Sequence, residues 1–339
     1  MSRVALLPKS TDSQVVLSVV VPYYNEVEVL TEFHSRLIKV LDALPDSSEI
    51  VYVNDGSTDG SFELVESLPV TGSHVVSLNL SRNFGKESAM SAGLEHCNGL
   101  AVLLIDADLQ DPPELIPSML GEWRKGFDVV NMQRIERNGE SWLKKKSAAV
   151  FYRLLNSLSE SDIPENVGDF RLLSRQVVDH INSMPERNRY MKGMFVWPGF
   201  KQTTIVFKRR ARHSGTTKWN YFKLFGLAID GITSFSISPL RFATVAGGLV
   251  AASAFFYGLA IVIKTLVFGE TTQGYPSMMV VELALGGIQL LSIGLLGEYI
   301  GRIFIETKRR PLYIIQSVSE RASKAQSVGQ DLPVMEKRA

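Results

Sequence analysis

The chain has 339 residues, a length that allows one large domain or two small ones. Its 36 lysine and arginine residues nearly balance 35 acidic residues, so the overall charge does not favour a nucleic-acid partner. The single cysteine, Cys97, excludes an internal disulfide and is typical of a reducing compartment. The first residues do not show a basic segment followed by an apolar core and a cleavage site, and we therefore expect no signal peptide.

After a polar segment at 1–14 that we expect to be flexible, predicted strands alternate with predicted helices. Apolar runs of strand length occur at 17–21, 49–53, 74–80, 102–105 and 127–132, and helical patterns occur at 27–44, 62–68, 86–97 and 113–125. This alternation predicts an α/β fold with a mostly parallel sheet and right-handed crossovers. In such sheets, ligands bind beyond the carboxyl ends of the strands.

Three polar turns, at 22–26, 54–60 and 106–111, follow predicted strands and should meet at one edge of the sheet. Each turn alone could be an ordinary loop, but three acidic turns at one edge favour a binding site. The pattern Gly-x-Gly-x-x-Gly does not follow the first strand, which argues against a dinucleotide cofactor.

The turn at 106–111 carries the most specific chemistry. Asp106, Asp108 and Gln110 are spaced two residues apart, and on an extended segment their side chains would point to the same side. Oxygen ligands alone suit a hard divalent cation, Mg²⁺ or Mn²⁺, rather than zinc. The alternative is a strand-ending acidic turn, because Asp and Pro are common turn residues.

The second half of the chain has features of a membrane protein. A basic amphipathic stretch at 142–158 could lie on an anionic membrane surface or be a domain helix, and a second candidate is 219–235. Residues 242–263 form 22 residues without a charge, roughly 33 Å as a helix, which is enough to cross a bilayer. A second apolar segment at 278–300 contains several glycines for close helix packing.

We therefore predict a transmembrane hairpin and divide the chain accordingly. The predicted parts are a flexible start (1–14), a cytoplasmic domain (15–218), an interfacial segment (219–239), two transmembrane helices (240–268 and 277–303) joined by an extracytoplasmic loop (269–276), and a cytoplasmic tail (304–339). Basic residues flank the hairpin but are missing from its loop, so both termini should be cytoplasmic. The tail is polar after about Ser317, and we expect that part to be disordered.

Five motifs, taken in order, make the family recognisable. They are Val-Pro-Tyr-Tyr-Asn-Glu at 21–26, Val-Asn-Asp-Gly-Ser-Thr-Asp-Gly at 53–60, Arg-Asn-Phe-Gly-Lys at 82–86, Asp-Ala-Asp-Leu-Gln-Asp-Pro at 106–112 and Val-Gly-Asp-Phe-Arg-Leu at 167–172. Together they resemble family 2 glycosyltransferases that act on polyprenyl phosphates, in the branch of the bacterial bactoprenol glucosyltransferases and dolichol-phosphate mannose synthase. The resemblance runs from about Leu17 to Ile315 and implies a GT-A, Rossmann-like domain that binds a nucleotide sugar.

The resemblance also implies roles for single residues. The nucleotide-sugar set comprises Pro22, Tyr24, Glu26, Val53, Asp55, Asp106, Ala107 and Arg134; the metal set comprises Asp106, Asp108 and Gln110; the lipid-phosphate set comprises Arg212 and Lys218. Asp108 and Asp169 would be catalytic, and Asp169 is expected to orient the sugar or the basic residues rather than act as a base. One departure from the family is Asn54, which stands where many relatives have Asp.

The implied function is transfer of glucose from UDP-glucose to undecaprenyl phosphate, with inversion, at the cytoplasmic leaflet of a bacterial inner membrane. Mg²⁺ or Mn²⁺ is the expected cofactor, and we also expect a homo-oligomer. Mannosyl or aminosugar transfer to the same lipid remains an alternative. A polysaccharide synthase of the same fold is a further one, although its usual Gln-x-x-Arg-Trp motif does not occur. The non-enzyme alternative is a membrane-anchored nucleotide-sugar binding protein, against which the intact Asp106, Asp108 and Gln110 argue.

Overall fold

The computed structural model describes residues 15–134, 167–187, 189–207 and 274–322, together with single helical residues between 240 and 267. The predictions for 1–14, for the basic stretch at 142–158, for the segment 219–235 and for Arg212 and Lys218 lie outside the described residues.

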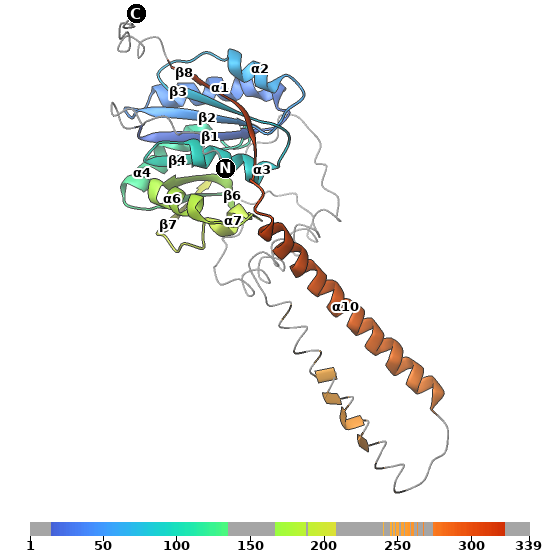
Figure 1. Cartoon of the computed structure of the whole chain (residues 1–339). Coiled ribbons are helices and arrows are strands. Elements are labelled where there is room, and N and C mark those ends of the chain that lie inside the picture. Colours follow the sequence, from blue (N-terminus) through green and yellow to red (C-terminus); the bar gives the residue numbers. More distant parts are fainter. Residues whose placement is uncertain are drawn as a thin grey trace, which may run out of the picture. The chain divides into compact units, whose positions relative to one another are not determined.

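The described residues form one eight-stranded sheet in the order β7-β5-β6-β4-β1-β2-β3-β8 (Figure 1). Its strands are β1 (Leu17–Tyr23), β2 (Ser48–Asn54), β3 (His74–Leu80), β4 (Ala101–Leu104), β5 (Val129–Arg134), β6 (Val167–Ser174), β7 (Gln202–Phe207) and β8 (Ile315–Arg321). β1 pairs in parallel with β2 and β4, and β3 continues the parallel set beside β2. β6 runs antiparallel between β4 and β5. The predicted mostly parallel α/β sheet of the GT-A type is confirmed.

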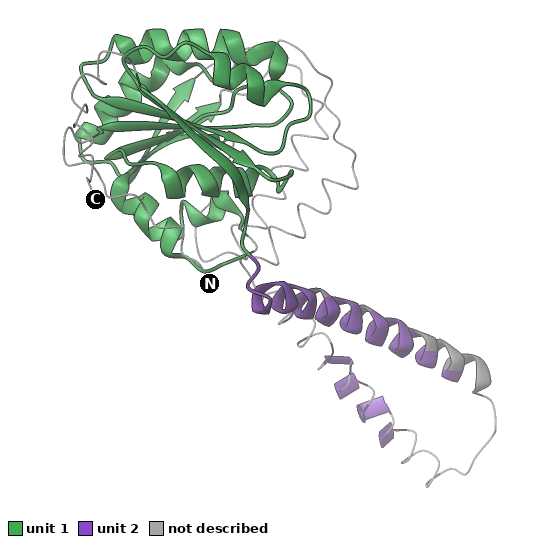
Figure 2. Cartoon of the chain, turned by 45° about the horizontal axis from the view of Figure 1, so that its top comes forward, with its two compact units in different colours: residues 1–145, 163–218, 311–339 green, residues 146–162, 219–310 purple. Residues whose placement is uncertain are grey.

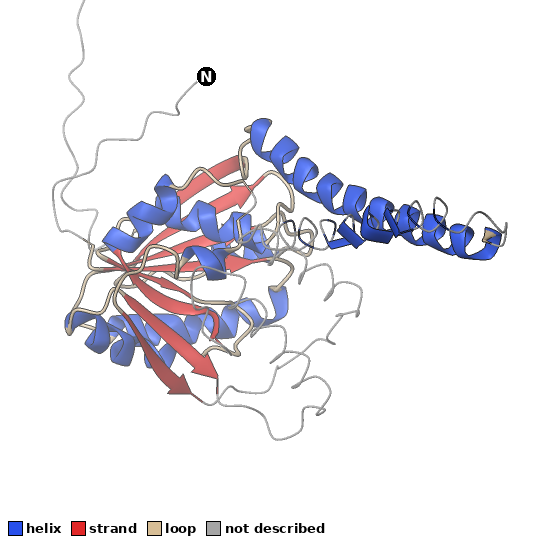
Figure 3. Cartoon of the chain, turned by 90° about the horizontal axis from the view of Figure 1, so that it is seen from below, coloured by secondary structure: helices blue, strands red, loops and turns tan. Residues whose placement is uncertain are grey.

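Helices cover both faces of this sheet (Figure 3). They are α1 (Val27–Asp42), α2 (Ser61–Ser67), α3 (Lys86–His96), the 3-10 turn η1 (Pro113–Leu115), α4 (Ile116–Arg124), α6 (Arg175–Ser183) and α7 (Met191–Met194). α1, α2 and α4 share one hydrophobic core with the sheet, while α3 and α6 pack together on the other face. All seven residues of β1 are buried, as expected for a strand covered on both sides.

Glycine allows α3 to approach the sheet closely. A Cβ atom on Gly93 would lie 2.2 Å from Val20 Cγ1 and 3.2 Å from Val53 Cγ2. The helix axis can therefore come nearer to β1 and β2 than any larger residue would allow. This close packing holds α3, whose first turn carries Lys86 and Glu87, against the sheet.

The segment after the apolar hairpin corrects one prediction. We expected a disordered tail from about Ser317, but Ile315–Arg321 forms β8 and pairs antiparallel with β3. Arg321 donates to the carbonyl oxygens of Val65, Glu66 and Leu68 at 2.7–2.8 Å. Polar residues form this strand because β8 is an edge strand whose hydrogen bonds, and not a buried apolar face, hold it in place.

The chain divides into two compact units, which Figure 2 colours separately. The first unit comprises residues 1–145, 163–218 and 311–339 and contains the whole sheet. The second comprises 146–162 and 219–310 and contains α10 (Tyr275–Thr307). Within α10, Ala284–Thr307 is the one helix among the described residues that is long and apolar enough to cross a membrane, with a mean hydropathy of 1.4. The second apolar segment is thus helical as predicted, while the first lies largely outside the described residues.

Candidate nucleotide-sugar site

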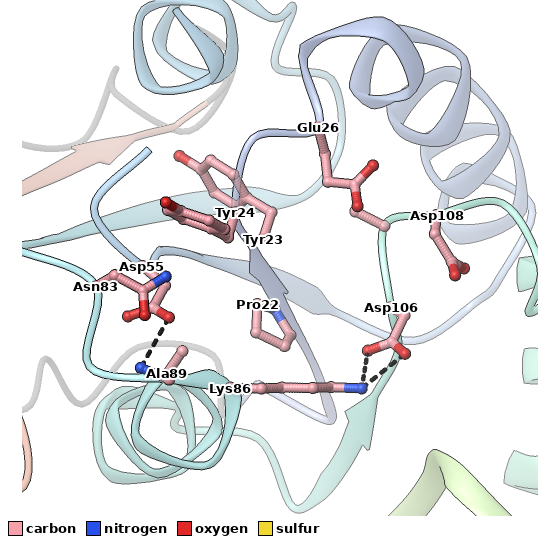
Figure 4. Close-up of a pocket in the computed structure, with 12 residues that line it drawn as sticks. Pro22, Tyr23, Tyr24, Glu26, Asp55, Asn83, Lys86, Ala89, Asp106 and Asp108 are labelled. Carbon is pink, nitrogen blue, oxygen red and sulfur yellow. Dashed lines mark hydrogen bonds and ion pairs between the residues drawn. The ribbon is translucent and has the colours of Figure 1, made fainter. Parts of the chain in front are cut away.

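The carboxyl ends of β1, β2 and β4 surround a cavity of about 370 Å³ (Figure 4). It is lined by Pro22, Tyr23, Tyr24, Glu26, Asp55, Asn83, Gly85, Lys86, Ala89, Asp106, Ala107 and Asp108. The three polar turns predicted to meet at one edge all contribute to this lining. A volume of this size suits a small-molecule ligand.

The turns after β1 and β2 are tied together by hydrogen bonds. The backbone N–H of Asn25 donates to Ser57 Oγ at 3.0 Å, and the N–H of Thr58 donates to Asn25 Oδ1 at 2.8 Å. Asn54 accepts the N–H of Ser57 at 3.0 Å and donates to Asn79 Oδ1 at 2.9 Å. Asn54 therefore organises the turn through its amide group.

Asp55 holds the loop between β3 and α3 against the cavity. Its Oδ1 accepts the N–H of Phe84 at 2.8 Å and its Oδ2 accepts the N–H of Gly85 at 3.0 Å. Burial raises the pKa of Asp55, and the two backbone hydrogen bonds oppose that effect. This predicted nucleotide-binding residue thus also positions Asn83, Gly85 and Lys86 in the lining.

The turn after β4 differs from the extended segment on which the metal prediction was based. β4 ends at Leu104, and Leu109 has a φ of +62°. The backbone therefore bends between Asp108 and Gln110. The side chains of Asp106, Asp108 and Gln110 are thus not arranged as they would be on an extended segment. Asp106 and Asp108 line the cavity, whereas Gln110 is buried and donates its side-chain N–H to Asp108 Oδ2 at 2.7 Å. Gln110 orients Asp108 in this structure.

The two carboxylates fit a divalent cation. The described residues include no group of three or more His, Cys, Asp or Glu side chains placed to hold a metal ion. Mg²⁺ needs only one or two protein carboxylates, because water and phosphate oxygens complete its coordination. Asp106 and Asp108 supply two such carboxylates on one wall of the cavity (Figure 4).

Lys86 joins the cavity to Asp169. Its ammonium donates to Asp106 at 2.7 Å and to Asp169 Oδ2 at 2.6 Å. Burial alone would lower the pKa of Lys86, but Asp106 and Asp169 raise it above its ordinary value, so the ammonium stays charged. Sequence reasoning assigned no role to Lys86, although it closes the Arg-Asn-Phe-Gly-Lys motif that supported the family resemblance.

Asp169 lies within a group of charged residues on β6, α3 and α7, in which Arg171 is buried and Lys86 is exposed. Burial alone would raise the pKa of Asp169, yet Lys86, Lys192 and Arg171 lower it overall. Arg171 is 2% exposed and donates to the carbonyl oxygen of Gly168 at 2.8 Å. Asp169 is therefore ionised and held by cations, which favours the predicted orienting role over a role as base.

Two residues predicted to bind the nucleotide sugar do not line the cavity. Val53 is fully buried and packs toward α3 at Gly93. Arg134 lies over Gly168, where an added Cβ atom would come within 2.5 Å of Arg134 Nη2, and its guanidinium is 3.8 Å from Asp111. The structure thus places Arg134 beside the Asp169 group. Of the expected set, Pro22, Tyr24, Glu26, Asp55, Asp106 and Ala107 do line the cavity.

A mostly parallel α/β sheet with an acid-lined cavity at its carboxyl edge defines an enzyme of the GT-A type. The chain belongs to the glycosyl transferase family 2, which matches residues 18–181, and its residues 238–303 match the GtrB C-terminal hairpin family. The resemblance drawn from the motifs is confirmed. The hairpin family and the apolar helix α10 also indicate membrane association.

Full-length relatives agree with this assignment. The chain is 47% identical over 304 residues to the prophage bactoprenol glucosyl transferase homolog of Escherichia coli (strain K12), covering 90% of this chain and 99% of that protein. It is 48% identical over 301 residues to the bactoprenol glucosyl transferase of Shigella phage SfX, covering 89% and 99%. The predicted enzyme class, a hexosyltransferase, is confirmed by the family and these relatives.

Solved structures show a more distant likeness. Glucosyl-3-phosphoglycerate synthase from Mycobacterium tuberculosis, crystallised with Mn²⁺, uridine diphosphate and glucosyl-3-phosphoglycerate, matches with a TM-score of 0.46 and 20% identity. The match covers 65% of this chain and 78% of that chain.

Proposed function

We propose that this enzyme transfers glucose from UDP-glucose to undecaprenyl phosphate, with inversion, at the cytoplasmic leaflet of a bacterial inner membrane. The observation that carries the proposal is the Lys86 bridge between Asp106, in the donor cavity, and Asp169, in the charged group beside it. The names of the relatives, bactoprenol glucosyl transferases, support the choice of the acceptor and of the sugar. A multi-pass anchor, cytoplasmic termini and a homo-oligomeric assembly belong to the same proposal.

The donor cavity requires a cation in order to hold a diphosphate. Four acidic side chains line it, from Glu26, Asp55, Asp106 and Asp108, and Lys86 is the basic side chain in that lining. Without a counter-charge, these carboxylates would repel the two phosphates of a nucleotide sugar. A divalent cation on Asp106 and Asp108 would offset this repulsion and the charge that builds on the departing nucleoside diphosphate.

The acceptor chemistry explains why Asp169 can be an ion-paired carboxylate. A phosphate monoester has a second pKa near 6 and is largely a dianion at pH 7, so its oxygen is already a nucleophile. It needs positioning and desolvation more than it needs a general base. Asp169, held by Lys86 at 2.6 Å, suits the positioning of the sugar and of the neighbouring cations.

The decisive experiment incubates membranes containing the full chain with a panel of radiolabelled nucleotide sugars, followed by extraction of the lipid product. We expect label from UDP-glucose in a lipid-linked product that mild acid hydrolyses. If only another nucleotide sugar labels the lipid, that sugar replaces glucose as the transferred sugar in the proposal. An active family relative is assayed in parallel as the positive control. If that relative forms product while this protein forms none from any donor, the proposal is contradicted.

Metal dependence gives a second test. Asp108→Asn keeps the size of the side chain but weakens its binding of a hard cation, so we expect transfer to fall at least about a hundredfold, which corresponds to about 2.7 kcal/mol. The matched control is Asp179→Asn on α6, where the carboxylate is 64% exposed and is not part of the cavity lining. Wild-type turnover that persists in excess EDTA would remove the metal from the proposal.

A further inference from the structure

Lys192 on α7 is a partly buried lysine to which the proposed function assigns no role. It lies at an intermediate level of burial, and among the described residues it makes no hydrogen bond or close ion pair. Asp169 attracts it, while Arg171, Arg134 and Lys86 repel it. A lysine in such surroundings is stabilised when an anion binds next to it.

The backbone around Lys192 is fixed on α3. The N–H of Met191 donates to Glu87 Oε2 at 2.8 Å, and the side chains of Met191 and Met194 are buried. The next residue, Phe195, is fully buried under the Arg171 guanidinium, which lies 4.1 Å from the ring centroid. The backbone that carries Lys192 is therefore held in place before any ligand arrives, which lowers the entropy lost on binding.

The charged groups around Asp169 have an excess of positive charge that an additional anion would balance. Lys86 already pairs with Asp169 at 2.6 Å and shares its charge with Asp106. Glu87, the other nearby carboxyl group, has a pKa raised to about 7, chiefly by burial, so it carries only part of a negative charge at neutral pH. Arg134 lies 3.8 Å from the carboxylate of Asp111, so Arg171 and Lys192 then remain as positive charges beside Asp169, and neither lines the donor cavity.

We propose that Lys192 binds the phosphate of the polyprenyl phosphate acceptor and that Glu87 is the positioning residue that holds α7 for this contact. The inference rests on the proposed function and identifies residues for its acceptor step. Phosphate oxygens occur in both substrates, but Lys192 lies beside Asp169 and outside the donor cavity lining, which favours the acceptor.

The test measures donor and acceptor affinities separately, with the full chain and a polyprenyl phosphate mixed in detergent micelles. Lys192→Ala should raise the KM for polyprenyl phosphate at least about tenfold, the loss of one charge-assisted contact of about 1.4 kcal/mol or more. The dissociation constant of UDP should stay within about twofold of the wild type. Lys192→Arg should restore most of the acceptor affinity. The control, Lys39→Ala, removes an exposed lysine on α1 and should change neither value.

Glu87 is tested by a pair of variants. Glu87→Gln retains an oxygen that can accept the Met191 N–H and should keep the acceptor KM near the wild-type value. Glu87→Ala removes it and should raise that KM, while UDP binding and the thermal unfolding midpoint identify any general loss of structure. If each variant weakened UDP binding as much as it weakened acceptor binding, a positioning role for Glu87 would be contradicted.

The outcomes separate this inference from the function on which it rests. A wild-type enzyme that transfers sugar, with an unchanged acceptor KM in Lys192→Ala, overturns the assignment of Lys192 alone. A fall in UDP affinity equal to the fall in acceptor affinity would place Lys192 at the donor and also overturn it. A wild-type protein that neither transfers sugar to polyprenyl phosphate nor binds it overturns both proposals.

Discussion

Gly56 and Gly60 lie in the same loop after β2, and both have a positive φ, +70° and +84°. Their surroundings differ. A Cβ atom on Gly56 would lie 2.4 Å from the carbonyl carbon of Arg82 and 2.6 Å from the nitrogen of Asn83, whereas a Cβ atom on Gly60 meets nothing within 4 Å. At Gly56 the obstacle is backbone, which cannot rotate away as a side chain can.

This pair gives a matched test of the proposed donor site. Gly60→Ala should cost only the backbone strain of a left-handed residue, about 1–2 kcal/mol. Gly56→Ala should cost more and also weaken UDP binding, because it displaces the loop that brings Asn83, Gly85 and Lys86 to the cavity. Thermal unfolding and UDP titration of both variants check the expectation. Equal losses in the two variants would show that the close approach at Gly56 is unimportant.

Residue types and spacing predicted the acidic residues of the cavity better than they predicted the contacts made by Lys86 and Gln110. Asp55, Asp106 and Asp108 follow strands directly, so the parallel arrangement alone carries them to one edge. Lys86 was missed because its role depends on partners 20 and 83 residues away, Asp106 and Asp169. The bend before Gln110 was not anticipated because periodicity cannot foresee a left-handed residue such as Leu109 within the turn.

At the scale of elements, β8 shows where local pattern fails. Its sequence, Ile-Gln-Ser-Val-Ser-Glu-Arg, lacks the apolar run that identified β1 to β4. What makes it a strand is the edge of β3, a partner more than two hundred residues earlier. Ser319 Oγ also donates to the Glu66 carboxylate at 2.7–2.8 Å, which ties the strand to α2.

Removing β8 should therefore destabilise the catalytic domain. A chain that stops after Ile314 loses the whole pairing with β3 and the three bonds from Arg321. We expect its unfolding midpoint to fall by at least about 5 °C, since roughly 1 kcal/mol shifts the midpoint of a domain this size by about 2–4 °C. The matched control stops after Ala322 and keeps β8. If the two truncated proteins unfold at the same temperature, the pairing contributes no stability.

At the scale of the whole molecule, β8 constrains the proposed passage of the chain through a membrane. β7 and β8 belong to one sheet, although the chain between them contains α10 and the uncharged segment 242–263. Both ends of that intervening chain must therefore lie on the same side, and the number of membrane crossings between them is even. If α10 crosses once, a second crossing must lie between Phe207 and Tyr275. The hairpin predicted from hydropathy satisfies this condition.

Cysteine labelling in intact cells tests that arrangement. The native Cys97 is 5% exposed, and burial raises the pKa of its thiol to about 11, so it should give little background with an impermeant thiol reagent. Gly274→Cys introduces a thiol at an exposed position just before α10, and Gln316→Cys introduces one at an exposed position on β8. We expect Gly274→Cys to react in intact cells, and Gln316→Cys to react only after permeabilisation, because nucleotide sugars reach the enzyme from the cytoplasm. Labelling of both positions in intact cells, or of Gln316→Cys alone, would contradict an extracytoplasmic loop and with it the proposed access of the donor.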